Sequence, residues 1–282
     1  MKPPAPFLFK LPADPTRLLI IAGPCVIESA DLCLQIATQL KSICQSLGFE
    51  YVFKASFDKA NRSSGSSFRG PGIENSLAIL NPGSIGWTPP FRPGIRQTRQ
   101  APQAPQVVDT LQIPAFLARQ TDLLQAAART GRAINVKKGQ FMSPHEMKNA
   151  LDKIAVGHAE HGHGPAPVLL TERGTFFGYN RLVNDFTGLA VMKSLGAPVL
   201  FDITHSTQQP AGEGTTSGGS PQFSPLLARA AIATGCVDGL FLECHPEPRK
   251  AQSDAATMLH LDQVKPLLEQ CAAIASLRRS FK

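Results

Sequence analysis

The amino-acid sequence predicts a (β/α)8 barrel, the α/β fold called a TIM barrel, in one domain spanning residues 1–282. Three observations predict it. The chain has 282 residues, which lies in the range over which α/β barrels fold as one domain. Short apolar runs alternate with helical patterns, as in a parallel sheet covered by helices. The runs start roughly 25 to 40 residues apart, which is the period of one βα unit.

The predicted strands are short apolar runs that contain β-branched or aromatic residues. They lie at residues 18–22, 51–54, 107–113, 133–137, 168–171, 198–203 and 239–243. Apolar residues at helical spacing predict helices at residues 30–47, 120–130, 144–156, 182–195 and 225–234, with a closing helix at 261–275. Seven strands are therefore visible where the barrel needs eight.

The step from the run at residue 51 to the run at residue 107 is about twice as long as the others, so one βα unit is missing between them. Residues 81–106 contain six prolines, four glutamines and no acidic residue. Nothing in this stretch alternates as a strand does. We expect residues 75–106 to be an atypical segment without a regular third strand.

Composition excludes several classes of protein. With 43% hydrophobic and 17% charged residues, the chain can bury a sizeable core and is not disordered as a whole. No run reaches the roughly 18 apolar residues of a membrane span. The N-terminus lacks the cleavage site of a signal peptide, so we expect a cytoplasmic protein that does not bind membranes. Six cysteines without a CxxC pair argue against a disulfide framework or a zinc ribbon.

The net charge of +7 comes with only one Trp and two Tyr. Nucleic-acid binding is not expected, because no basic face is interleaved with stacking aromatic residues. Small anionic substrates suit this balance better, although a modest positive excess can also be without functional meaning. Neither a Walker A nor a GxGxxG pattern is present, so the sequence gives no support for nucleotide binding.

Cationic side chains follow several of the predicted strands. The active site of a TIM barrel lies at the C-terminal ends of its strands, so these side chains converge there. We call this set the cation basin, and it consists of Lys54, Lys59, Arg62, Lys137 and Arg173. Several buried positive groups are tolerable only when anions neutralise them, and phosphate and carboxylate groups are the natural partners. The alternative is a set of rim residues that form ordinary salt bridges.

Candidate metal ligands follow the first, seventh and eighth predicted strands, which are neighbours in a closed barrel. They are Cys25, His205, Glu243 and Asp254. A thiolate, an imidazole and two carboxylates suit a divalent transition metal such as Zn, Mn or Fe. Taken alone, Cys25 is as easily explained as a small buried apolar residue.

Two other motifs receive a plainer interpretation. The histidines of residues 158–164 precede the sixth strand and so lie at the opposite end of the barrel, where we expect a solvated loop. The glycine-rich residues 212–220 follow the seventh strand, and we expect either a mobile lid over the substrate or a plain flexible loop.

Taken together, these motifs carry a family resemblance that extends from about residue 18 to residue 274, except for residues 75–106. The matching stretches read AGPCVIES, YVFKASFDKANRSS, FRGPGIE, LQIPAFLARQTDLL, NVKKGQF, LTERGTFFGYN, FDITHS and LFLECHPEP. They resemble the 3-deoxy-D-manno-octulosonate 8-phosphate synthases, and KANRSS and LARQTDL are the most specific of them. The sister family that makes the seven-carbon shikimate precursor shares the barrel but lacks KANRSS.

The resemblance implies a transferase of lipopolysaccharide biosynthesis that condenses phosphoenolpyruvate with D-arabinose 5-phosphate and releases phosphate. It assigns phosphoenolpyruvate to Lys54, Lys59, Lys137, Gln112, Gln140 and Arg173. It assigns the pentose phosphate to Asn61, Arg62 and Ser63, with Arg119 supplied by a neighbouring subunit of a homotetramer. Members with Cys at the position of Cys25 depend on a metal, which Cys25, His205, Glu243 and Asp254 would hold.

The catalytic residues expected on these grounds are Lys54, Lys59, Lys137, Arg173 and His205. Two alternatives stay open at this point. One is a related phosphoenolpyruvate-dependent synthase, similar to the seven-carbon enzymes, that uses another sugar. The other is a catalytically impaired barrel.

The impaired alternative comes from residues 75–106, where the resembling family has a helix and a third strand that ends in an Asp and a His. This chain has no Asp or Glu between Glu74 and Asp109. The resemblance resumes in register at Val107, so residues are replaced rather than inserted. A local change of reading frame or a true divergence into a new loop explains the segment. Either one predicts a weakened barrel and reduced activity.

Overall fold

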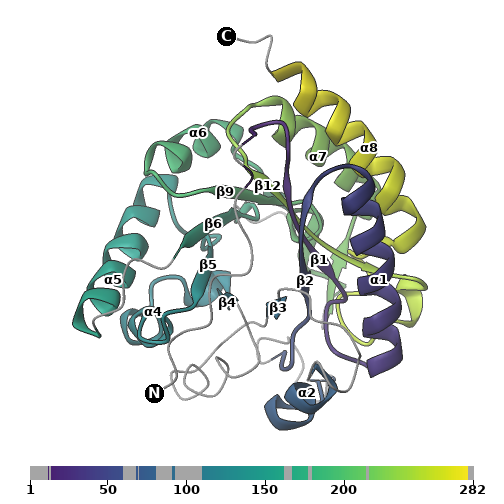
Figure 1. Ribbon diagram of the computed structural model, residues 1–282, viewed down its shortest axis with the longest axis horizontal. Helices are drawn as coiled ribbons and strands as arrows, with labels where there is room; N and C mark the ends of the chain where they lie inside the picture. Colours follow the sequence, from purple (N-terminus) through teal and green to yellow (C-terminus); the bar gives the residue numbers. More distant parts are fainter. Residues whose placement is uncertain are drawn as a thin grey trace.

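Eight parallel strands follow one another in barrel order in this computed structural model, which describes residues 12, 14–59, 68, 70–80, 91–92, 110–161, 167–176, 180–213 and 216–278. Figure 1 shows them as a curled sheet with helices on its outer face. From one edge to the other the strands are β3 (Phe91–Arg92), β2 (Glu50–Lys54), β1 (Leu19–Gly23), β12 (Gly239–His245), β9 (Val199–Asp202), β6 (Val168–Glu172), β5 (Ala133–Lys137) and β4 (Thr110–Ile113). The predicted α/β barrel class is confirmed.

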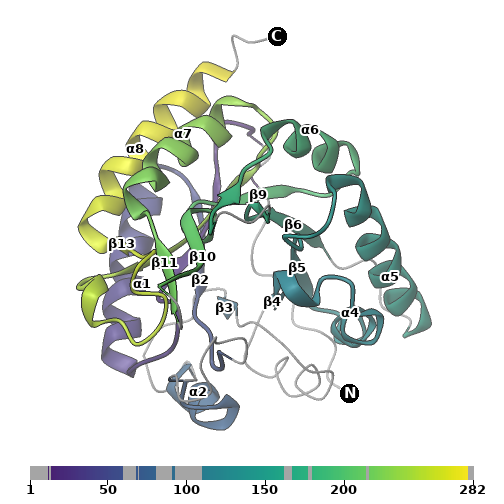
Figure 2. The same ribbon diagram turned by 180° about the vertical axis from the view of Figure 1, so that it is seen from behind.

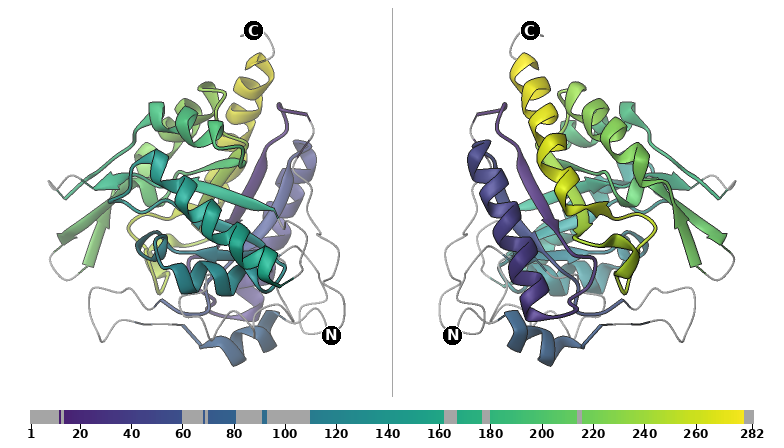
Figure 3. Two further views of the ribbon diagram at one scale, coloured as in Figure 1. Left: turned by 90° about the vertical axis from the view of Figure 1, so that its left-hand side faces the viewer. Right: turned by 90° about the vertical axis from the view of Figure 1, so that its right-hand side faces the viewer.

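Helices cover the outside of this sheet. They are α1 (Ala30–Ser46), α4 (Thr121–Ala128), α5 (Met147–Glu160), α6 (Phe186–Ser194), α7 (Ser224–Ala233) and α8 (Leu261–Leu277). The first and last of them, α1 and α8, lie side by side (Figure 3). At the start of α1 the Ser29 side chain accepts a hydrogen bond from the Leu32 backbone N–H, which ends the preceding loop. No helix in the described ranges is long and apolar enough to cross a membrane.

The two faces of each strand contact different parts of the core. Leu19, Ile21 and Phe241 belong to a small cluster inside the barrel, whereas Ile20 belongs to the larger cluster between the sheet and the helices. Successive strand residues point to opposite faces, so this alternation continues to the ends of the strands. It determines which polar side chains at the rim face inward.

One helix prediction was wrong at its start. Residues 182–195 were expected to be helical, but Leu182–Val183 form β8, which pairs antiparallel with β7 (Thr175–Phe176), and the helix begins only at Phe186. The apolar residues at 182 and 183 fit both patterns. Asp185, whose backbone is extended, takes the N-cap position, where aspartate is favoured.

Residues 75–106 were expected to lack a regular third strand, and the structure describes only part of this segment. A helix, α2 (Ile73–Leu80), is followed by β3, which pairs in parallel with β2 through Phe53 with Phe91 and Lys54 with Arg92. The strand has only two residues and is flanked by Pro90 and Pro93, so it leaves no alternating pattern in the sequence. Residues 81–90 and 93–109 lie outside the described part. Within the described residues, no hydrogen-bonded ladder joins β3 to β4.

The glycine-rich stretch is more regular than a plain flexible loop. It overlaps an antiparallel hairpin of β10 (Gln208–Glu213) and β11 (Thr216–Gly219), which projects from the barrel (Figures 2 and 3). A Cβ atom at Gly219 would lie 2.4 Å from Thr257 Cγ2 and 2.6 Å from the Ala256 oxygen. Glycine is therefore required at this position because the hairpin passes close to the chain that follows β12.

The histidine-rich stretch was only partly understood from the sequence. His158 is buried on α5, and His161 follows the end of that helix, so a fully solvated loop was the wrong expectation. Residues 162–166, which include His163, lie outside the described part. The helix precedes β6, in agreement with the expected position away from the C-terminal ends of the strands.

Gly239 gives a direct test of the sheet. It pairs with Leu19 at the start of β12, where a Cβ atom would lie 1.9 Å from the Leu19 carbonyl oxygen. Because that oxygen belongs to a buried strand, we expect Gly239→Ala to lower the free energy of unfolding by about 3 kcal/mol. Denaturant unfolding measures this loss of unfolding free energy. The comparison is Gly196→Ala, at a positive φ of 85° with open space around it, which should cost only about 1 kcal/mol. Equal losses would contradict the close approach of the strands.

Candidate active site

The C-terminal ends of the strands bring together buried charges of both signs. Lys54 ends β2, Lys137 ends β5, Asp202 ends β9, and Glu243 lies near the end of β12. All four are buried. Buried charges are stable only when they are paired, and here the cations and the carboxylates of different strands pair with one another. The predicted cation basin therefore also contains anionic groups.

Two lysines surround Glu243. The Lys54 ammonium group pairs with Glu243 Oε1 and also donates hydrogen bonds to the backbone oxygens of Pro24, at 3.2 Å, and Cys25, at 3.0 Å. Lys59 Nζ lies 3.8 Å from Glu243 Oε1 and 3.8 Å from Asp254 Oδ2. These contacts position both ammonium groups beside the Glu243 carboxylate.

A second group joins Lys137, Asp202 and His205. Asp202 Oδ2 lies 2.5 Å from Lys137 Nζ and 2.8 Å from His205 Nδ1, and its other oxygen accepts the His205 backbone N–H at 2.9 Å. Burial would raise the pKa of Asp202, but the charge and hydrogen-bond interactions with His205 and Lys137 hold that pKa well below its usual value. Burial lowers the pKa of His205, and it lowers the pKa of Lys137 to about 8. A lysine that titrates this close to neutral pH is typical of a functional site.

Arg173 and Gln112 present unpaired polar atoms at the same rim. Arg173 Nη2 donates to the His205 oxygen at 2.7 Å and to Gln208 Oε1 at 2.6 Å. Its Nε and the Oε1 of Gln112 are buried and have no hydrogen-bond partner among the described residues. Gln140 is buried as well. Buried polar atoms are normally hydrogen-bonded, so the free N–H of Arg173 indicates a place for an anionic ligand.

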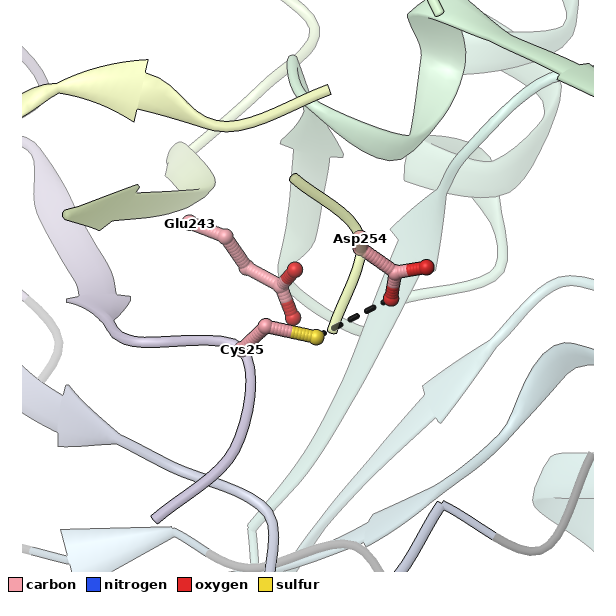
Figure 4. A group of neighbouring side chains, drawn as sticks. All are labelled: Cys25, Glu243 and Asp254. Carbon is pink, nitrogen blue, oxygen red and sulfur yellow. Dashed lines mark hydrogen bonds between the residues drawn. The ribbon is translucent and has the colours of Figure 1, made fainter. Parts of the chain in front are cut away.

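Three side chains lie close enough to hold a metal ion. One ligand atom each from Cys25, Glu243 and Asp254 lies within 4.8 Å of the others, and Figure 4 shows the three pointing toward one another. The Cys25 thiol donates to Asp254 Oδ2 at 3.0 Å and lies 3.2 Å from the Ser253 hydroxyl. Burial and the two carboxylates raise the pKa of Cys25, so without a cation it is a thiol.

The donor set fits a divalent transition metal. Glu243 Oε2 is buried and makes no hydrogen bond within the described residues, so it is a free carboxylate oxygen beside the thiol. Asp254 has a positive φ of 52°, a rare conformation for an aspartate that often marks functional sites. His205 Nε2 lies 3.6 Å from Glu243 Oε1, next to this group but outside the three mutually close atoms.

Not every predicted site residue is found in this group. Asn61, Arg62 and Ser63 lie outside the described residues. The Arg119 side chain is 65% exposed and lies 4.0 Å from Glu146, so it does not join the buried charges of its own chain. Asp202 was not among the site residues predicted from the sequence. Its spacing of three residues from His205, directly after a strand, was the signal that could have identified it.

The family model that matches residues 13–278 is described as the DAHP synthetase I family. The chain belongs to this family. Curated relatives named 2-dehydro-3-deoxyphosphooctonate aldolase come from Cyanothece sp., at 51% identity over 93% of this chain and 93% of the relative, and from Albidiferax ferrireducens, at 50% over 93% and 92%. A third relative of the same name, from Syntrophotalea carbinolica, is 52% identical over 92% and 91%. These relatives match the chain along nearly its whole length.

Proposed function

We propose that this chain condenses phosphoenolpyruvate with D-arabinose 5-phosphate and water to give 3-deoxy-D-manno-octulosonate 8-phosphate and inorganic phosphate. The observation that carries the proposal is the buried rim of Lys54, Lys137 and Arg173, with an unpaired Arg173 N–H, beside a thiol and carboxylate group suited to a metal. The names of the relatives support the eight-carbon product. They favour this reaction over the seven-carbon alternative and over an impaired barrel.

In this proposal the cationic side chains hold the enol phosphate. The carboxylate and phosphate of phosphoenolpyruvate carry the negative charge that Lys54, Lys59, Lys137 and Arg173 neutralise, with Gln112 and Gln140 completing the site. C3 of the enol attacks the aldehyde carbon of the sugar, and water adds at C2. The C–O bond to phosphate then breaks. The proton released by the water balances the proton gained by the aldehyde oxygen.

Cys25, His205, Glu243 and Asp254 would hold a divalent metal, Zn, Mn or Fe. When bound, such an ion supplies Lewis acidity that orients an aldehyde or polarises water. The protein's own contribution at this point is to keep four donors from three strand ends next to Lys54 and Lys59. Those two ammonium groups hold the carboxylates in place before a metal binds.

The pentose phosphate would bind to Asn61, Arg62 and Ser63, with Arg119 from a neighbouring copy in a homotetramer. Two features of Arg119 support its role between subunits. It is largely exposed, and Phe116, close to it in the chain, and Phe141, after β5, are both about half exposed. Aromatic residues and arginine are enriched in the contacts between subunits. We propose the cytoplasm as the location, because phosphorylated substrates of this size do not cross membranes unaided.

The experiment uses purified protein supplied with divalent metal and phosphoenolpyruvate. D-Arabinose 5-phosphate, erythrose 4-phosphate and mannosamine are added in separate reactions, and phosphate release is measured. We expect release with arabinose 5-phosphate at a rate at least tenfold above the other two, a difference of about 1.4 kcal/mol in activation free energy. Turnover with only one of the other sugars would replace this proposal with the related synthase.

Asp202 provides a test of the buried charge network. In Asp202→Asn the amide oxygen can still accept the backbone N–H of His205, but the charge that faces Lys137 and His205 is lost. We expect kcat to fall roughly 100-fold, because the ammonium and imidazole groups lose their orienting partner. Phosphate release measures this. Glu269→Gln, in an exposed pair on α8, is the control and should keep full activity. Normal turnover by folded Asp202→Asn would show that Asp202 is dispensable.

A further inference from the structure

Two buried charged residues adjoin the site without belonging to it. Lys138 follows Lys137 at the end of β5, and Glu172 precedes Arg173 at the end of β6. Their side chains are each 1% exposed, and Lys138 Nζ lies 3.4 Å from Glu172 Oε2. Lys137 pairs with Thr171 in the β5 and β6 ladder, so the next residues along, Lys138 and Glu172, share the opposite face of the sheet. The proposed reaction uses neither side chain.

The bonds of this pair connect the two loops that carry the phosphoenolpyruvate groups. Lys138 Nζ donates to the Met142 oxygen at 3.1 Å and lies 3.3 Å from the Gly139 oxygen, so it fixes the turn that contains Gln140. The same nitrogen lies 3.2 Å from the Thr175 hydroxyl, in the loop after β6. One ammonium group therefore joins the loop after β5 to the loop after β6.

Glu172 fixes the other side of the connection. Its Oε1 accepts the backbone N–H of Arg173 at 2.8 Å and of Gly174 at 2.6 Å. These bonds set the backbone direction at Arg173, whose guanidinium group carries the unpaired Nε at the rim. A backbone hydrogen bond from Phe176 N–H to the Gln140 oxygen, at 2.9 Å, ties the two loops together again.

Stability alone does not explain a buried pair in this position. Taking two charges out of water costs several kcal/mol, and an apolar pair of similar volume is often as stable or more stable. What an apolar pair cannot supply is the five polar contacts that Lys138 and Glu172 make with the two loops. Hydrogen bonds are directional, so these contacts fix the backbone positions from which the neighbouring side chains extend.

We propose that Lys138 and Glu172 are positioning residues for phosphoenolpyruvate, which act by holding the strand ends that carry Lys137, Gln140 and Arg173. The proposal rests on the proposed function, in which those three side chains bind this substrate. Within the described residues, the hydrogen bonds of the pair go to the loops after β5 and β6, which carry groups assigned to phosphoenolpyruvate. Loss of the pair should therefore weaken the binding of phosphoenolpyruvate and not the binding of arabinose 5-phosphate.

The test measures the binding of phosphoenolpyruvate separately from the use of arabinose 5-phosphate. In Glu172→Gln an amide oxygen replaces the carboxylate oxygen that accepts the two backbone N–H groups. The substitution removes the charge that faces Lys138. Thr175→Val removes only the hydroxyl that contacts Lys138 and introduces no charge change. The matched control is Asp152→Asn, which breaks the exposed Lys148 and Asp152 pair on the neighbouring helix α5. The dissociation constant of phosphoenolpyruvate is measured by calorimetry, and the KM of arabinose 5-phosphate by phosphate release.

We expect Glu172→Gln to raise the dissociation constant of phosphoenolpyruvate about tenfold, which is roughly 1.4 kcal/mol. Thr175→Val should raise it about threefold, and Asp152→Asn should leave it unchanged. The KM of arabinose 5-phosphate and the content of bound metal should stay within about twofold in all three, because the hydrogen bonds described for the pair go to the loops after β5 and β6. A merely structural role would instead lower the unfolding midpoint and leave the affinity of the folded protein unchanged.

The outcomes separate this proposal from the proposed function. Unchanged phosphoenolpyruvate affinity in folded Glu172→Gln overturns the positioning role. If that variant does not fold, unchanged affinity in Thr175→Val overturns it. If the parent binds phosphoenolpyruvate but turns over only with erythrose 4-phosphate, the proposed function fails while the affinity comparison still decides the role of the pair. A parent that does not bind phosphoenolpyruvate refutes both.

Discussion

Lys137→Met is expected to lower kcat roughly 1000-fold, because its ammonium group is the buried positive charge held between Asp202 and the ring of Phe241. Its Nζ lies 3.7 Å from the centre of that ring, and the side chain is buried. Without it, the negative charge of Asp202 faces the bound anion directly, and like charges repel. Phosphate release from phosphoenolpyruvate and arabinose 5-phosphate measures the effect.

Lys148→Met is the matched control, since Lys148 is an exposed lysine on α5 in an ordinary surface pair. It should keep full activity. The unfolding midpoint of Lys137→Met should be measured in parallel to show that the variant is folded. A folded Lys137→Met that retains more than about a tenth of the parent rate contradicts the assignment of Lys137 to the substrate site.

Removal of the metal is the second large effect expected. Treatment with a chelator should abolish phosphate release, and Zn, Mn or Fe should restore it. Cys25→Ala should lose the bound metal and reduce kcat at least about 100-fold, since the thiolate is the soft donor in the group with Glu243 and Asp254. Elemental mass spectrometry of the purified protein reports the metal independently of the rate.

Cys236→Ala is the control for this experiment. Cys236 is a free cysteine outside the site and is only partly buried. Its replacement should change neither metal content nor rate. If chelated protein or Cys25→Ala retains full activity, Cys25 is only a packed side chain and the chain works without a metal.

Most of the barrel follows from periodicity in the sequence. β5 occupies the predicted residues 133–137, and α1 differs from the predicted helix only at its last residue. These elements have long or strongly apolar patterns, and burial against a neighbouring layer fixes them. The short elements do not have such patterns. β3 has two residues between prolines, and the hairpin of β10 and β11 is made mostly of polar and glycine residues.

The clustering of the site side chains at one end of the barrel was predictable for a related reason. Parallel strands end at one rim, so Cys25, Glu243 and Lys54 could be placed together without knowledge of the side-chain geometry. Pair geometry was not predictable. Nothing in the sequence shows that Asp202 contacts both Lys137 and His205, because those contacts depend on the register of three strands. The exposed position of Arg119 likewise depends on the direction of the turn after β4.

The most direct test of the proposed reaction uses phosphoenolpyruvate labelled with heavy oxygen in the bridge between carbon and phosphorus. The protein, supplied with metal, is incubated with this substrate and D-arabinose 5-phosphate, and both products are identified by mass spectrometry. The proposed reaction predicts the eight-carbon 3-deoxy sugar acid phosphate, with the label in the released inorganic phosphate because the C–O bond breaks. Label retained in the sugar acid, or no eight-carbon product from metal-loaded protein, would contradict it.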